Sequence, residues 1–329
     1  MMKANSINKN RRAFIRKAGV YGLSTIAAPA AVSMLATGCK KDFLQRDPLD
    51  AVTDVSFWKT DAQLKLAVNG CYAYLKGKNV VDFENLGDNT IYPPTSDYQA
   101  ISSGNYDFTR GTLNTEWATQ YAGIRRCNYF LENYTKADGI VNATTLARYA
   151  GEVKFLRAFL YSYLTFFFGD VVLITKALDV DDEQVYGTRN KRTEVVDFIL
   201  KDLDEAAASL PNTYGAADLG RITKGAALGW KARVALFYQK YDVAEVASKA
   251  VMDLNVYQLY SNGNKATSYN ELFTWKGKLA AGTNKETMLA RLYLKDVSVH
   301  NMSRECQVPD QTSRFCPTKS LVESYLCTD

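Results

Sequence analysis

Apolar residues recur every three or four positions through the middle of the chain, the spacing that buries one face of an α-helix. The first predicted helix has Asp61 as its N-cap. Its apolar positions are Leu64, Val68, Cys71, Tyr72 and Leu75. Further helices are predicted over residues 114–134, 144–168, 193–210, 223–239 and 243–254. The chain is therefore predicted to be mainly α-helical.

The helices 223–239 and 243–254 are separated by a tight turn at residues 240–242. Small residues stand where the two helices would approach each other: Ala227, Ala232, Ala235, Ala244, Ala247 and Ala250. The pair is typical of a tetratricopeptide hairpin, although no strict 34-residue repeat runs along the chain. We therefore expect stacked antiparallel helix pairs, a scaffold on which loops carry recognition.

The helical period is interrupted between Gly77 and Leu113, where Tyr92-Pro93-Pro94 is the clearest breaker. Long irregular segments in an ordered chain are often functional. From Tyr257 the pattern changes again, because residues 287–294 predict a strand and residues 296–317 are polar and rich in turns. A last amphipathic helix begins at Leu321 and is still running at Asp329, so we expect a fragment of a longer protein.

Residues 1–38 have the pattern of an export signal. A basic start is followed by an Ala-rich apolar stretch from Ala18 to Leu35 and by Ala36-Thr37-Gly38 before Cys39. Small residues before a cysteine predict cleavage by a lipoprotein signal peptidase and an acylated Cys39. The alternative is an ordinary secretory leader with an incidental cysteine. Arg11-Arg12 fits either twin-arginine export or a generic basic start.

Charge narrows the range of partners. The whole chain carries +5, but residues 1–38 contain six Lys or Arg and no acid, so removing them leaves −1. A nearly neutral mature chain lacks the basic surface that nucleic acid requires, which favours neutral molecules or proteins as partners. No second apolar run is long enough to span a bilayer.

The chain offers little for a metal or a catalytic cofactor. His300 is its one histidine, and no Cys-x-x-Cys pair is present, so neither a metal nor a cofactor is predicted. Cys71 and Cys127 lie on apolar helix faces and are predicted core residues. The sequence allows a disulfide between Cys306 and Cys316 in an oxidising compartment but does not require one. His300 is read as a surface residue.

Two further features of the long helix 144–168 are read as structural. The aromatic run of Tyr161, Tyr163 and residues 166–168 has core spacing rather than that of a stacking platform. Arg157 is expected to be buried and paired with Glu152 or Asp170.

Several short motifs follow one another along the chain. They are Cys39 with Asp42-Phe43-Leu44 and Asp47-Pro48, Phe57-Trp58, Val68-Asn69-Gly70-Cys71-Tyr72, Ile124-Arg125-Arg126-Cys127-Asn128, Phe155-Leu156-Arg157-Ala158 after Glu152, Phe168-Gly169-Asp170-Val171, Tyr269-Asn270-Glu271-Leu272-Phe273, and Pro317-Thr318 with Leu321-Val322 and Tyr325. In order and spacing they resemble the SusD/RagB family of nutrient-binding outer-membrane lipoproteins.

The resemblance implies a SusD-like superhelix of tetratricopeptide-like pairs, with an irregular C-terminal part that contains short strands. It implies a signal peptide at 1–38, a linker at 39–60, a helical domain at 61–255 and an incomplete C-terminal region at 256–329. It also implies no catalytic activity, and delivery of oligosaccharides or peptides to a SusC-like, TonB-dependent transporter. Lys40-Lys41 departs from the acidic residues that often follow the lipid cysteine in surface-exported relatives.

Neutral sugars are bound by flat apolar rings together with amides, carboxylates and arginine. The irregular segment supplies both kinds, in Asp88, Asn89, Tyr92, Asp97, Tyr98, Asn105, Tyr106 and Arg110. The C-terminal part adds Trp275, Tyr293 and Arg304. In the resembling family the long loop after the first helix contributes to the ligand surface, so these residues form the predicted site. The alternative is that Tyr92 and Tyr106 only pack over the helices.

The sequence thus predicts a non-catalytic, lipid-anchored oligosaccharide-binding protein of the outer membrane, displayed on the cell surface. A tetratricopeptide-like scaffold that binds proteins and no glycan is the alternative. The chain lacks His-Glu-x-x-His, a Gly-x-Ser-x-Gly motif in its mature part, and phosphate-binding glycine motifs. A glycosidase stays open, because its two carboxylates need not be close in sequence.

Overall fold

The computed structural model describes residues 57–92, 96–274, 277, 284–294, 296–302 and 315–325. The predicted signal peptide, Cys39, Trp275, Arg304 and Cys306 lie outside these ranges.

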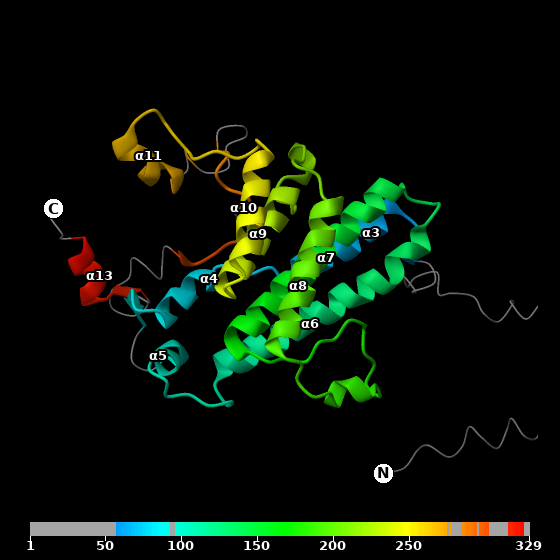
Figure 1. The fold of residues 1–329 in the computed structure, drawn as a ribbon, viewed down its shortest axis with the longest axis horizontal. Helices are drawn as coiled ribbons and strands as arrows, with labels where there is room; N and C mark the ends of the chain where they lie inside the picture. Colours follow the sequence, from blue (N-terminus) through cyan, green and yellow to red (C-terminus); the bar gives the residue numbers. More distant parts are fainter. Residues whose placement is uncertain are drawn as a thin grey trace, which may run out of the picture. The chain divides into compact units, whose positions relative to one another are not determined.

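Helices dominate the described residues, which confirms the predicted fold class (Figure 1). The longer ones are α3 (Asp61–Tyr72), α6 (Gly111–Asn133), α7 (Ala143–Phe168), α8 (Arg192–Ser209), α9 (Lys224–Phe237), α10 (Tyr241–Asp253) and α11 (Lys265–Leu272). Shorter ones are α4 (Asn79–Asp82), α5 (Asp97–Ser102) and α13 (Lys319–Ser324). Single 3-10 turns are η3 (Phe83–Leu86), η4 (Tyr134–Ala137), η5 (Glu183–Tyr186) and η6 (Ala216–Asp218).

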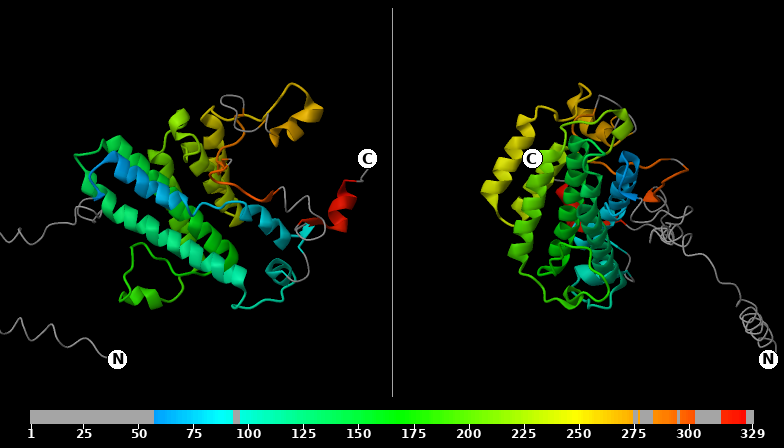
Figure 2. Two further views of the ribbon diagram at one scale, coloured as in Figure 1. Left: turned by 180° about the vertical axis from the view of Figure 1, so that it is seen from behind. Right: turned by 90° about the vertical axis from the view of Figure 1, so that its right-hand side faces the viewer.

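The helices pack in the order in which the chain makes them. α6 contacts α7, α7 contacts α8, α8 contacts α9, and α9 contacts α10, while α3 lies against α6 and α7. The end-on view in Figure 2 shows this succession from α3 and α6 to α9 and α10. The arrangement agrees with the predicted stack of tetratricopeptide-like helix pairs.

Two predicted helix boundaries were wrong. Thr60, not Asp61, caps α3: its hydroxyl accepts a hydrogen bond from the Gln63 amide at 3.2 Å, whereas Asp61 accepts one from the Tyr149 hydroxyl at 3.0 Å. Residues 240–242 are not all turn, because α10 begins at Tyr241. The turn is displaced to the residues before it, where Gln239 takes the left-handed conformation with φ 58°.

The predicted strand over 287–294 is also absent. Leu294 forms only an isolated antiparallel bridge with Ser298. A strand needs a neighbour to satisfy its backbone groups, and no described strand runs beside these residues. The described strands are β1 (Thr90–Ile91) and β2 (Cys316–Pro317), which are antiparallel, with Thr90 opposite Pro317.

The core is built around α7, which is buried along most of its length. Its largest fully buried side chains are Tyr149, Phe155, Leu156, Leu160, Tyr161 and Leu164. The helix ends where predicted, at Gly169, whose φ of +70° favours glycine. Cys71 and Cys127 are buried free thiols, which confirms their prediction as core residues. No described helix is both long and apolar enough to cross a membrane.

The aromatic run at the end of α7 is core only in part. Tyr161 is fully buried, whereas Tyr163 and residues 166–168 are half-buried. These half-buried rings pack against other aromatic side chains, namely Phe83, Trp117, Trp230, Phe237 and Tyr238.

Arg157 is buried, but its partner is neither residue expected from the sequence. Its guanidinium donates two hydrogen bonds to the Asp202 carboxylate on α8, at 2.8 and 2.9 Å, and a third to the Asn128 amide oxygen on α6, at 2.9 Å. Burial raises the pKa of Asp202, and the bonds from Arg157 oppose that rise. The pair therefore joins three helices inside the core.

Glu152, the partner expected for Arg157, is fully buried in a different network. It accepts hydrogen bonds from Arg221 at 2.6 Å, from the Tyr72 hydroxyl at 2.8 Å and from the Tyr214 hydroxyl at 3.2 Å. Burial raises the pKa of Glu152, and the charge of Arg221 opposes that rise. This carboxylate ties α7 to α3 and to residues 214–221.

We expect Asp202→Ala to lower the free energy of unfolding by about 3–5 kcal/mol, because it leaves the Arg157 charge buried and unpaired. Urea denaturation followed by circular dichroism measures the loss. The matched control is Asp253→Ala, which removes an exposed pair with Lys249 and should cost no more than about 0.5 kcal/mol. Similar losses in both variants would show that the buried pair has no special role.

Candidate functional site

The segment from Gly77 to Leu113, predicted to be irregular, contains the short elements α4, η3, β1 and α5. It therefore has more secondary structure than the sequence predicted. Pairing of β1 with β2 brings Thr318 against the loop. The Thr318 amide donates to the Asn89 carbonyl at 2.9 Å, and its hydroxyl donates to the Asp88 carbonyl at 2.7 Å. Both loop residues are exposed, and their backbone rather than their side chains holds this contact.

Aromatic rings follow along the same loop. Tyr92 and Tyr98 are half-buried, with ring centroids 5.2 Å apart and planes inclined at 44°. Tyr106 is 53% exposed and Phe108 is 86% exposed. Exposed aromatic rings beside polar groups suit stacking against a partly apolar ligand. Phe108 was missed in the sequence, where the only available signal was an aromatic residue among polar ones.

Asp97 fastens this loop to α6. Its carboxylate accepts a hydrogen bond from the Thr112 amide at 2.9 Å, in the first turn of that helix. The N-cap residue of α6, Arg110, makes no side-chain capping bond, so Asp97 supplies an acceptor in its place. The bond from the Thr112 amide lowers the pKa of Asp97. The Arg110 guanidinium lies 3.7 Å from the same carboxylate and donates to the Asn105 carbonyl at 3.4 Å. The structure thus brings Arg110 against the backbone of Asn105, and the role of both residues in binding a ligand stays a prediction.

Tyr293 lies in a different setting from the loop tyrosines. Its hydroxyl accepts a hydrogen bond from the Lys78 amide at 2.9 Å, and its ring meets the His300 ring edge-on at 4.9 Å. Tyr293 lines a cavity of about 830 Å³, here called the Tyr293 cavity. Its described walls are residues 76–78, Val81, Leu219, Leu272, Asn284, Thr287, residues 290–294, His300 and Met302. His300 is exposed, as predicted, but it also faces this cavity.

A buried lysine stands at the wall of the Tyr293 cavity. Lys76 is 8% exposed, and its ammonium group donates to the buried Glu116 carboxylate. Its nitrogen also lies 5.3 Å and 5.0 Å from the ring centres of Phe83 and Tyr163. Burial lowers the pKa of Lys76, and Glu116 opposes the effect. A lysine just after a helix resembles a solvated residue in sequence, so no pattern pointed to this site.

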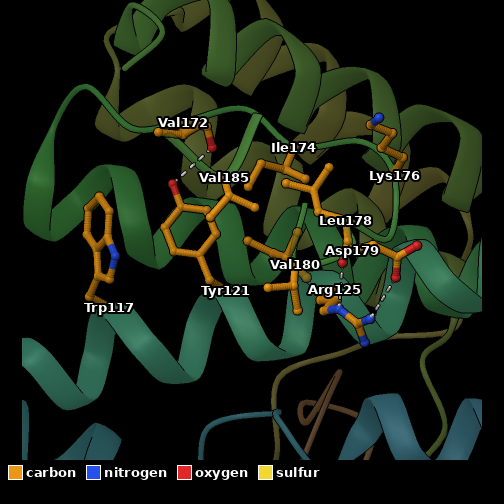
Figure 3. Close-up of a pocket in the computed structure, with 11 residues that line it drawn as sticks. Trp117, Tyr121, Arg125, Val172, Ile174, Lys176, Leu178, Asp179, Val180 and Val185 are labelled. Atoms are coloured by element: carbon orange, nitrogen blue, oxygen red, sulfur yellow. Dashed lines mark hydrogen bonds and ion pairs between the residues drawn. The ribbon is translucent and has the colours of Figure 1, made fainter. Parts of the chain in front are cut away.

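A second cavity, of about 500 Å³, lies between α6 and residues 172–185 (Figure 3). The Tyr121 hydroxyl donates to the Val172 carbonyl at 2.9 Å, and Arg125 donates to the Leu178 carbonyl at 3.1 Å. Burial raises the pKa of Tyr121 to about 12. The other walls are largely aliphatic: Ile124, Val172, Ile174, Leu178, Val180 and Val185. Such walls suit an apolar group better than a sugar with many hydroxyl groups.

A family described as "Starch-binding associating with outer membrane", with the name SusD-like, matches residues 42–236. A SusD-like protein P38 from Formosa agariphila is 29% identical over 67% of the chain and 43% of its own length. A SusD-like protein from Bacteroides ovatus is 24% identical over 82% of the chain and 50% of its length. The chain spans about half the length of the curated relatives that it matches.

Solved structures share the same fold. A SusD-like protein from Bacteroides fragilis has a TM-score of 0.66 and 28% identity, over 76% of this chain and 48% of that one. A laminarin-binding SusD-like protein has a TM-score of 0.58 and 25% identity, over 70% of this chain and 50% of that one.

We expect Asp97→Ala to loosen residues 97–110 while leaving the helices folded. Loss of a helix cap costs about 1 kcal/mol, so amide hydrogen exchange in this loop should become about fivefold faster at pH 7. Because the pKa of Asp97 is lowered on folding, its stabilising contribution is complete above the usual aspartate pKa. It is lost as the pH falls through the lowered value.

Mass spectrometry of peptides from the loop measures this exchange. The control is Asp107→Ala, because the Asp107 carboxylate bonds only to Thr109 within the loop itself. Equal acceleration in the two variants would contradict a role for Asp97 as the fastening between loop and helix.

Proposed function

Because the chain belongs to the SusD-like family of starch-binding proteins that associate with the outer membrane, we propose that it binds oligosaccharides without cleaving them. It does so as a lipid-anchored component of an outer-membrane nutrient uptake complex. The observation that carries the proposal is the loop from Asp88 to Arg110. It combines exposed aromatic rings with amide, carboxylate and guanidinium groups, and Asp97 holds it against α6.

The proposed ligand surface contains Asp88, Asn89, Tyr92, Tyr98, Asn105, Tyr106 and Arg110, with Tyr293 and Trp275 from the C-terminal part. Phe108 joins them because it is the most exposed ring of the loop. The similarity to a laminarin-binding relative supports a glycan as the ligand class. The family description supports the outer membrane as the place of action.

Export, anchoring and partnership complete the proposal. Residues 1–38 direct export, Cys39 receives the acyl chains, and residues 39–60 link the anchor to a helical domain over 61–255. Residues 256–329 belong to a C-terminal region that contributes to the ligand surface. The protein stands at the cell surface and passes its ligand to a SusC-like, TonB-dependent transporter.

A protein-binding scaffold that takes no glycan is the competing function. The stacked helix pairs favour it, because such stacks present extended surfaces to protein partners. The two functions differ in what the aromatic loop contacts, and a binding assay with the loop altered separates them.

We expect the triple variant Tyr92→Ala, Tyr98→Ala and Tyr106→Ala to weaken oligosaccharide binding by at least tenfold. Each lost ring contact costs about 0.5–1.5 kcal/mol, and roughly 1.4 kcal/mol corresponds to a factor of ten. Isothermal titration calorimetry with starch and laminarin oligosaccharides, extended to acidic ones, measures the affinity. Circular dichroism checks the helices, and chromatography of the recovered sugar checks that it is uncleaved.

The matched control for the tyrosines is Tyr241→Ala on α10, a tyrosine 62% exposed and outside the loop. Unchanged binding in the triple variant would reject the loop as the ligand surface. Absence of binding to every glycan by the unaltered chain would favour the scaffold function, and cleavage of the sugar would favour a glycosidase.

We expect Cys39→Ala to move the protein from the membrane fraction to the soluble fraction and to abolish incorporation of labelled palmitate. Without its thiol the first mature residue cannot carry the acyl chain that the anchor requires. The control is Cys316→Ser, which alters an exposed thiol in the C-terminal part. An unaltered chain that incorporates no labelled palmitate and lies in the soluble fraction would support the ordinary secretory leader instead.

A further inference from the structure

We propose that the Tyr293 cavity binds an acidic unit of the oligosaccharide, a carboxylate or a sulfate, with Arg291 as its counter-ion. The proposal rests on the proposed function and specifies the class of glycan. The cavity of about 830 Å³ lies within the range of small-ligand sites and has room for several sugar units.

The charged side chains around the cavity are of one sign. Lys76, Lys78 and Arg291 line it together with the titratable His300. None of the described residues that line it is acidic. A cavity lined by one sign of charge focuses its field into the space between the walls, so it attracts the opposite charge.

The two lysines are each paired with a carboxylate that does not line the cavity. Lys76 is bonded to Glu116, and Lys78 is bonded to both oxygens of Asp82, at 2.9 and 3.0 Å. These pairs balance the charges of both lysines. Neither lysine is therefore the group that an acidic ligand must neutralise.

Arg291 differs from both lysines. Its side chain is exposed, and its guanidinium donates to the Leu75 carbonyl and lies 5.9 Å from the centre of the Tyr293 ring. No carboxylate of the described residues lies within ion-pair distance of it. A guanidinium has five N–H donors in a planar fork, so most of them are left for a carboxylate or sulfate, which it binds through two parallel bonds.

Gly77 makes this arrangement possible. A Cβ atom at this position would stand 2.8 Å from the Tyr293 hydroxyl oxygen and 3.3 Å from an Arg291 terminal nitrogen. The absence of a side chain lets both groups approach the backbone after α3. The proposed binding position for the anion thus lies between two segments of the chain, residues 75–78 and residues 291–293.

The cavity is continuous in sequence with the proposed ligand loop. Val81 of α4 lines the cavity, and η3 leads from α4 directly to Asp88. η3 also contacts α5 and β1, the two elements that carry the loop. An oligosaccharide lying on the loop can therefore place one unit in the cavity, where a charged unit gains charge-assisted bonds that a neutral unit lacks.

The test compares sugars that differ only in charge. Isothermal titration calorimetry with oligogalacturonate and its methyl ester varies a carboxylate, and a carrageenan oligosaccharide with its desulfated form varies a sulfate. We expect the unaltered chain to bind the charged member of one pair at least tenfold more tightly. We also expect this preference to fall as the NaCl concentration rises.

Arg291→Gln should reduce the affinity for the charged sugar to that for its neutral counterpart, which should be unchanged. Arg291→Lys keeps the charge without the fork and should retain part of the preference. The matched control is Arg125→Gln, which alters an arginine of the cavity beside α6 and should leave the preference intact.

Equal affinity for charged and neutral sugars in both pairs would overturn the acidic subsite while leaving glycan binding in place. So would a preference that survives in a folded Arg291→Gln. Absence of binding to all four sugars and to starch and laminarin oligosaccharides would instead overturn the proposed function. Because the preference and its salt dependence are measured on the unaltered chain, the test holds even if one variant does not fold.

Discussion

A charge inside a helix that is covered on almost every side must find its partners on neighbouring helices, and this constraint organises the molecule. Arg157 of α7 binds Asp202 of α8 and Asn128 of α6. Asn128 in turn donates hydrogen bonds to the carbonyls of Ile174 and Lys176, at 3.0 and 3.1 Å. The buried guanidinium of Arg157 thus holds α7 against both α8 and α6. Through Asn128 it also positions Ile174 and Lys176, which line the cavity beside α6.

The extent of α7 was predictable because it depends on local spacing. The predicted helix 144–168 and the observed α7 (Ala143–Phe168) differ by one residue, since the apolar period and the glycine stop are both local. The partner of Arg157 was not predictable in this way. Asp202 lies 45 residues away along the chain, and spacing within a helix shows which face is buried but not what covers it.

Only part of the candidate site could be predicted from the sequence. Aromatic and polar residues between Tyr92 and Arg110 could be recognised because they interrupt a helical pattern. Lys76 and Arg291 could not, because their positions depend on contacts over long sequence separations. Arg291 reaches the Leu75 carbonyl across 216 residues, and Tyr293 reaches the Lys78 amide across 215. The predicted strand over 287–294 was wrong for a related reason: apolar residues do not make a strand unless a partner strand lies beside them, and none of the described strands does.

The pairing of β1 with β2 bears on the order in which the chain folds. Two residues in each strand join parts of the chain more than 220 positions apart, through a ladder too short to hold by itself. The entropy of closing so long a loop is not recovered by so few bonds unless the intervening helices are already packed. We therefore expect the rim of the proposed ligand loop to be completed late, after the helical stack has brought its two ends together.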